Sequence, residues 1–161
     1  MRKSSLFLSV LLTLSVAYAT SYLLTLQQKV TACRAVLRLS LTEVQPPQAT
    51  NRSIIQRVCI CKAKVLEVLK GPLDLKEIQF RFHPYDGVKL PSVGGEYFVF
   101  LHELDDVYWV LQGPYGVRPI ADQYDEARIL AKGKISTETF SHTNFVAAIR
   151  AFAAEPDTKK Q

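Results

Sequence analysis

Apolar and polar residues alternate along the chain beyond residue 30. Between Thr31 and Leu41 every second residue is apolar, a set made up of Cys33, Ala35, Leu37, Leu39 and Leu41. The residues between them are polar, with Val36 as the one exception. A repeat of two predicts a strand with one buried face. We expect this strand to end within residues 45–51, because the prolines there cannot donate hydrogen bonds to a ladder.

Four further strands are expected, over residues 54–69, 78–82, 97–101 and 107–111. The long second segment places Cys59, Cys61, Ala63 and Val65 on one face. Its alternation blurs after that point, which predicts a bulge or strong coiling. The segment at 97–101 is almost continuously apolar and is therefore expected to be central. A hairpin turn at 103–106 joins it to the last strand.

The C-terminal third is expected to end in a helix. Residues 113–116 break the fifth strand, and 117–120 resume a short extended piece. Residues 122–132 fit either a helix or, at 128–130, one more short strand, and the pattern does not choose between them. Ser141 or Thr143 can cap the final helix. Its apolar positions are Phe145, Val146, Ile149 and Phe152.

Strands followed by a terminal helix define the expected fold class. Five strands fit a small OB-like barrel, so we predict a mainly β protein with a five-stranded barrel and a C-terminal helix. A β-sandwich is the alternative, but it usually needs about seven strands.

The first nineteen residues have the order of a secretory signal peptide. A basic start at Arg2 and Lys3 precedes an apolar run, residues 6–16, that is too short to span a bilayer. Small residues at Ala17 and Ala19 then occupy the positions that signal peptidase reads. We therefore expect cleavage after Ala19 and a periplasmic or secreted protein. The alternative is an uncleaved N-terminal anchor, because residues 20–26 are still fairly apolar.

The length of the chain and the predicted elements define the expected domain organisation. A chain of 161 residues is long enough for one domain. The expected parts are a signal peptide at 1–19, an N-terminal extension at 20–29, the barrel at 30–120, a helical extension at 121–154 and a polar tail at 155–161. The formal net charge of +5 falls by two, to +3, once Arg2 and Lys3 are removed. This mild excess is no signature of nucleic-acid binding.

Three short motifs carry a resemblance to a known group. Residues 65–71 read Val-Leu-Glu-Val-Leu-Lys-Gly, residues 95–101 read Gly-Glu-Tyr-Phe-Val-Phe-Leu, and residues 113–117 read Gly-Pro-Tyr-Gly-Val. Over residues 30–120 this pattern resembles exported, often bacterial, proteins of the tissue-inhibitor-of-metalloproteinase and netrin-module group. The resemblance implies an OB-like barrel and a binding module rather than an enzyme.

Metalloproteinase inhibitors of that group use a Cys-x-Cys at the mature N-terminus, where the free amine helps to chelate the protease zinc. In this chain Cys59-Ile60-Cys61 lies in the middle of an expected strand and has no free amine. The resemblance therefore carries over the fold and not the inhibitory chemistry.

Cys33, Cys59 and Cys61 are the three cysteines of the chain and the candidates for a disulfide. If the first two strands are antiparallel neighbours, Cys33 is expected opposite residues 61–65. A disulfide needs Cα atoms within about 7 Å, so the pairing stays open. Cys59 and Cys61 are also the candidates for a copper(I) or redox site, because soft thiolates select such metals. There are two other interpretations: the cysteines are buried and pack as small hydrophobic residues, or one of them pairs with a cysteine of another molecule.

Other chemistry is sparse. His83, His102 and His142 are scattered, and no zinc-ligand spacing, nucleophile elbow or phosphate loop occurs in the sequence. We therefore expect no catalytic residue, no cofactor and no enzyme. A set of aromatic residues could stack on sugars or bases, or could fill the core and rim of a barrel: Tyr85, Tyr97, Tyr108, Trp109 and Tyr115.

The resulting hypothesis is an exported, non-enzymatic binding module. Its expected partner is an unidentified protein or envelope component. Nucleic acid is not expected, and the membrane is expected only if the signal segment is retained. The alternatives are a thiol- or metal-dependent periplasmic protein that uses Cys59 and Cys61, and an N-terminally anchored structural envelope protein.

Overall fold

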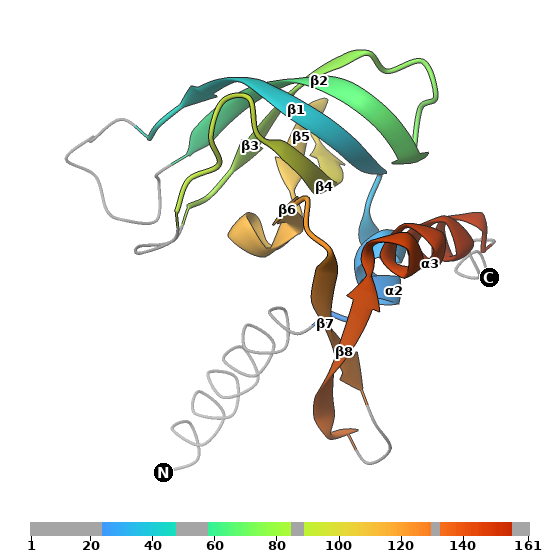
Figure 1. The fold of residues 1–161 in the computed structure, drawn as a ribbon. Helices are drawn as coiled ribbons and strands as arrows, with labels where there is room; N and C mark the ends of the chain where they lie inside the picture. Colours follow the sequence, from blue (N-terminus) through green and yellow to red (C-terminus); the bar gives the residue numbers. More distant parts are fainter. Residues whose placement is uncertain (1–23, 48–57, 85–88, 130–132, 156–161) are drawn as a thin grey trace, which may run out of the picture.

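The computed structural model describes residues 24–47, 58–84, 89–129 and 133–155 (Figure 1). The predicted signal peptide with its cleavage site at Ala19, the start of the predicted second strand at 54–57 and most of the polar tail lie outside these residues. In the described parts of the chain, no helix has both the length and the apolar character needed to cross a membrane.

Five strands close into a barrel, which confirms the predicted fold class. They are β1 (Ala35–Gln45), β2 (Cys59–Lys70), β3 (Glu77–Phe82), β4 (Glu96–Leu104) and β5 (Val107–Val110). Their order around the barrel is β1-β2-β3-β5-β4, and β4 pairs back onto β1 to close it. The pairing of β3 with β5 is parallel, and the other pairings are antiparallel. The short strand β6 (Val117–Pro119) pairs with β4 where an extended piece was predicted.

The predicted irregularity in the second strand is confirmed. Leu39 pairs with Val65 and Arg38 pairs with Glu67, so Leu66 is left over as a bulged residue. A bulge increases the local twist of a strand. This twist lets β2 curve around the barrel and pair with both β1 and β3.

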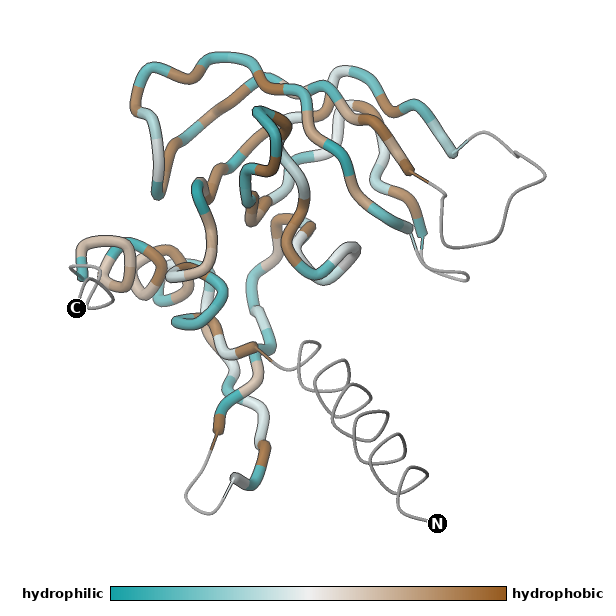
Figure 2. Tube along the Cα trace, turned by 180° about the vertical axis from the view of Figure 1, so that it is seen from behind, coloured by the Kyte–Doolittle hydropathy of each residue, from teal (hydrophilic) through white to brown (hydrophobic). Residues whose placement is uncertain are grey.

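The first residues of β1 are buried on both faces of the strand, which explains the exception in its pattern. Its inward residues, Ala35, Leu37, Leu39 and Leu41, lie in the barrel core. Val36 points the other way and is fully buried in a second core, together with Phe98 and Phe100 of β4. Figure 2 shows polar and hydrophobic positions alternating along the barrel strands. Val36 departs from that alternation because a further layer covers it.

That layer consists of α2 (Leu26–Ala32), β7 (Gln123–Ile129), β8 (Ile135–Ser141) and α3 (His142–Ala154). The two helices lie against each other beside one end of the barrel, and the β7–β8 hairpin projects away from it (Figure 1). The open choice at 122–132 is resolved as a strand that is longer than the expected 128–130. In the extension predicted at 121–154, the β7–β8 hairpin therefore comes first and the predicted final helix follows it as α3.

Local capping signals account for the two helices. Thr25 accepts a hydrogen bond from the backbone of Gln28, whose side chain accepts one from the backbone N–H of Thr25 in return, and this capping box starts α2. The strand predicted from Thr31 therefore begins later, at Ala35. Ser141, one of the two predicted caps, accepts from the backbone of Asn144 and starts α3.

Candidate functional site

The three cysteines lie in two different cores. Cys59 and Cys61 point into the barrel, whereas Cys33 is buried in the second core. Cys61 pairs with Val44 at the far end of β1, so the predicted placement of Cys33 opposite residues 61–65 is wrong. The reason is that β1 continues to Gln45 and β2 starts only at Cys59. Val44 lies nine positions beyond Ala35 along the strand, about 30 Å at the usual rise, so Cys33 cannot bridge either thiol of β2.

Burial also suppresses the chemistry of these thiols. All three are free thiols in the structure. Burial raises the pKa of Cys33 to about 12, against the smaller opposing effect of Lys70 and Lys29. Burial raises the pKa of Cys61 to about 12 as well, with a contribution from Cys59, whose own pKa burial raises. Protonated, enclosed thiols are poor nucleophiles and poor metal ligands. Within the described residues, no group of three or more His, Cys, Asp or Glu side chains is placed to hold a metal ion.

The aromatic residues singled out in the sequence do not share a face. Tyr97 is buried in the barrel core, where its hydroxyl accepts a hydrogen bond from the backbone of Ser92 at 3.0 Å. Tyr108 packs against the same core from a half-buried position. Tyr115 is exposed on the short 3-10 helix η2 (Gly113–Gly116), and Tyr85 lies outside the described residues. Trp109 is the member of this set that lies on the outer face of the barrel.

Strand pairing places Trp109 in a row of four outward residues. Ile60 pairs with Arg81, Arg81 pairs with Trp109, and Trp109 pairs with His102. These four residues, here called the outer row, come from β2, β3, β5 and β4 and are all half-buried. They point outward because their neighbours in each strand fill the barrel core: Cys61, Phe80, Val110 and Leu101.

The centre of the outer row is an aromatic stack with a cation beside it. The ring of His83 stacks on Trp109 with centroids 5.2 Å apart and planes inclined by 22°. The guanidinium carbon of Arg81 lies 5.8 Å from the Trp109 ring centroid, within the range of a cation–π contact. The Nε of Arg81 is buried and has no hydrogen-bond partner among the described residues. Desolvation lowers the pKa of His102, so its imidazole is neutral at pH 7.

The outer row also has a defined place in the barrel. Ile60, at one end of the row, follows the β1–β2 connection, and Trp109 follows the β4–β5 turn. OB barrels bind oligonucleotides and oligosaccharides over strands 2 and 3, between these same two connections. The side-chain arrangement thus lies where this class of barrel takes its ligands.

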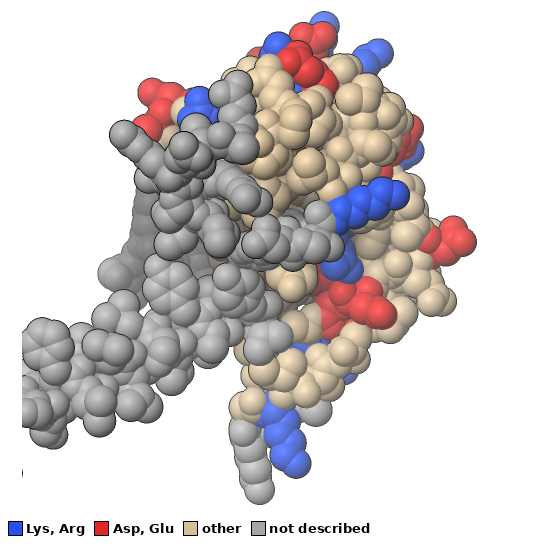
Figure 3. All heavy atoms as spheres, turned by 90° about the vertical axis from the view of Figure 1, so that its left-hand side faces the viewer, with Lys and Arg blue, Asp and Glu red and all other residues tan. Residues whose placement is uncertain are grey.

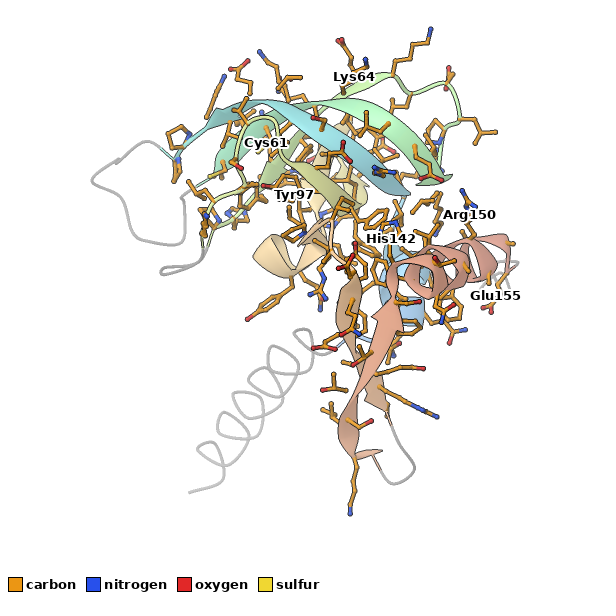
Figure 4. All side chains as sticks on the ribbon, in the orientation of Figure 1. Cys61, Lys64, Tyr97, His142, Arg150 and Glu155 are labelled. Atoms are coloured by element: carbon orange, nitrogen blue, oxygen red, sulfur yellow. The ribbon has the colours of Figure 1, made fainter. Side chains whose placement is uncertain are left out.

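A hollow on the same outer face extends the row. Its volume is about 410 Å³, and its polar lining consists of Thr42, Lys62, Lys64, Glu77 and Gln79. Lys62 donates a hydrogen bond to Glu43 at 2.7 Å. Lys64 projects outward on the strand whose Cys61 points into the barrel (Figure 4). On the face seen in Figure 3, charged side chains of both signs are mixed over the barrel, so no continuous basic field is present there.

Buried charges elsewhere have a structural explanation. The Nζ of Lys29 on α2 lies 2.5 Å from Glu126 Oε2 on β7. The other carboxylate oxygen of Glu126 makes no hydrogen bond, but Arg118 of β6 lies 3.3 Å from it. This cluster joins α2, β6 and β7, and it contains no group directed at the outer row.

Sequence reasoning named Trp109, His83 and His102 separately and did not foresee their association with Arg81. The association depends on the parallel pairing of β3 with β5, which brings together residues that are distant in the sequence. No protein-family model matches this chain, and no curated protein matches its sequence significantly. The resemblance to the tissue-inhibitor-of-metalloproteinase and netrin-module group therefore stays a prediction.

Proposed function

We propose that this protein is an exported, non-enzymatic binding module whose ligand lies across the outer row. The observation that carries the proposal is the stack of His83 on Trp109 beside Arg81, at the place where OB barrels bind. Aromatic and cationic side chains that are half-buried on an outer sheet face can bind a ligand by stacking and charge attraction, without any catalytic group. The buried, protonated thiols support this class over the thiol- or metal-dependent alternative.

The ligand class that the surface fits best is an oligosaccharide that carries carboxylate or sulfate groups. The stacked rings of Trp109 and the exposed His83 offer an aromatic surface for a sugar ring. Arg81 can bind an anionic group through its planar fork of donors, and Lys64 adds a second cation in the adjoining hollow. The adjoining hollow mixes both signs of charge, from Lys62, Lys64 and Glu77, and together with the mild net charge this favours such a ligand over nucleic acid.

Binding can be measured through Trp109, because it is the single tryptophan of the chain. The mature protein is titrated with dextran, dextran sulfate and alginate while its intrinsic fluorescence is recorded. We expect the sulfated or carboxylated polymer to change the emission and the neutral polymer to have little effect. Arg81→Ala is expected to weaken binding by about tenfold, as the loss of a desolvated cation–π and anion contact predicts.

Arg150→Ala is the matched control, because it removes the same charge from an exposed position on α3. Binding to this variant should equal that of the original protein. Equal losses for both variants would indicate general charge attraction and contradict the assignment of the outer row. Failure of all three polymers to bind would contradict the proposed ligand class.

The export half of the proposal has its own test. The N-terminal residue of the protein recovered from the periplasm or the culture medium is determined by mass spectrometry. We expect Thr20, the residue after Ala19. A protein retained in the membrane fraction with residues 1–19 intact would instead support the anchored alternative.

A further inference from the structure

The β7–β8 hairpin is packed at one end and bare at the other. Its ladder runs from the pair Gln123–Ser141 to the pair Ile129–Ile135. Near the first pair, Tyr124 and Phe140 pack in the second core against α3. The other end projects away from the barrel and both helices (Figure 1).

The projecting end exposes apolar side chains. Ile129 and Ile135 are 51% and 52% exposed, and they lie opposite each other on one face of the hairpin. Figure 2 shows hydrophobic positions on both strands at this end. A two-stranded hairpin is only marginally stable in water without a further strand or a packed face. Among the described residues, the projecting end therefore lacks the partner that such a hairpin needs.

The open edge of the hairpin is that of β8. Within the described residues, β7 is the one strand that pairs with β8. The other edge of β7 is already engaged through a parallel bridge between Ala127 and Thr25. A strand edge with unpaired backbone groups is a template for a strand from another chain.

We propose that a second copy of this chain pairs its β8 with this edge, so that two hairpins form one four-stranded antiparallel sheet. Such a contact uses the same surface on both subunits and closes with twofold symmetry. The proposal does not depend on the binding function assigned to the outer row.

Charge complementarity selects the register. A twofold axis at Ser136 places Lys134, the residue just before β8, opposite Glu138 of the partner subunit, and symmetry creates the same pair a second time. Lys134 and Glu138 are both exposed, and neither is in an ion pair found among the described residues. A twofold axis at Glu138 would instead place two like charges opposite each other, which is unfavourable.

The same register also fits the apolar side chains. Ile135 lies opposite Thr137 of the partner subunit, on the face that carries Ile129. Cross-strand pairs of β-branched residues stabilise a sheet. The exposed isoleucines of both hairpins would then line one continuous face of the new sheet.

Sedimentation of the mature protein tests the contact. We expect monomer and dimer to be in equilibrium, with both species detectable at protein concentrations up to roughly 100 µM. Lys134→Glu and Glu138→Lys each place two like-charged pairs in the contact, and each should weaken the dimer by roughly tenfold or more. The double variant Lys134→Glu/Glu138→Lys restores opposite charges and should dimerise as the original protein does.

Mixing the two single variants gives the sharpest result. Lys134→Glu carries two carboxylates and Glu138→Lys carries two ammonium groups, so the two variants should form a heterodimer more tightly than either forms a dimer with itself. The matched control is Lys76→Glu, an exposed lysine in the β2–β3 connection, and it should leave dimerisation unchanged. A protein that is monomeric at every concentration, or a dimer that the single changes leave intact, would overturn the proposal.

Discussion

Lys29 and Glu126, which lie 97 residues apart in the sequence, form a buried ion pair in which Nζ and Oε2 are 2.5 Å apart. The side chain of Glu126 is 1% exposed and that of Lys29 is 9% exposed. Arg118 is the second cation near the same carboxylate. The pair joins the helix that precedes the barrel to the hairpin that follows it.

Removal of the carboxylate is expected to be more harmful than removal of either cation. Glu126→Leu leaves the ammonium of Lys29 buried without a partner, and we expect it to lower the free energy of unfolding by about 3–5 kcal/mol. Lys29→Met should cost less, because Arg118 still compensates the charge of Glu126. Urea unfolding of the mature protein measures both values.

The double variant Lys29→Met/Glu126→Leu is the control for this interpretation. Apolar replacement of both partners of a buried pair is often close to neutral. We therefore expect the double variant to be more stable than Glu126→Leu alone. Strict additivity of the two single changes would show that the two side chains do not interact.

The buried thiols predict a loss of stability in alkaline solution. The pKa of Cys33 rises from 9.0 to about 12 on folding, so above pH 9 the unfolded chain releases a proton that the folded chain retains. Stability from this group is complete below pH 9 and is lost as the pH rises toward 12. The free energy of unfolding should fall more steeply over this range in the original protein than in Cys33→Ala.

The β4–β5 turn offers a stabilising substitution. Asp105 and Asp106 form a two-residue hairpin turn in which both have positive φ, 50° and 59°. Turns of this type favour Asn-Gly, because glycine adopts positive φ without steric cost. Asp105→Asn/Asp106→Gly should raise the free energy of unfolding by about 0.5–1 kcal/mol in thermal denaturation. Asp106→Val should lower it, since a β-branched residue is strained there.

Gly116 is a position where any side chain collides with the backbone. A Cβ added there would lie 2.1 Å from the carbonyl oxygen of Leu111 and 2.6 Å from a methyl carbon of Val110. Gly116→Ala is therefore expected to destabilise the protein by about 3 kcal/mol or more. Gly133→Ala is the comparison, because space is open there and only its φ of 72° is unfavourable. A similar midpoint of unfolding for both variants would contradict the collision.

The barrel could be predicted from the sequence because β2 and β3 bury only one face and β4 is almost continuously apolar. Strand β8 could not, because Phe140 is its only apolar residue packed against the second core, and Ile135 is exposed. The apolar alternation of strand β7 is interrupted for a different reason: the buried residue two positions after Tyr124 is the charged Glu126. A search for alternating apolar residues does not detect a strand in which one of the buried positions is a charged residue in an ion pair.

Helix α2 was missed although a local signal was present. The Thr25–Gln28 capping box can be read from the sequence, but α2 has only seven residues and no long apolar period follows it. The outer row was beyond sequence reasoning for another reason. Arg81 lies beside Trp109 only because β3 and β5 are neighbours, and that adjacency is a property of the closed barrel.

Because the first residues of β1 are buried on both faces of the strand, the barrel is not separable from the layer that covers it. Val36 on β1, with Phe98 and Phe100 on β4, faces the helices instead of water. A shortened protein that ended at residue 120 would keep every strand of the barrel, yet it would lose β7, β8 and α3, which bury these three side chains together with α2. Autonomous folding of that fragment is not expected, because the barrel and the layer beside it share β1 and β4 and form one folding unit.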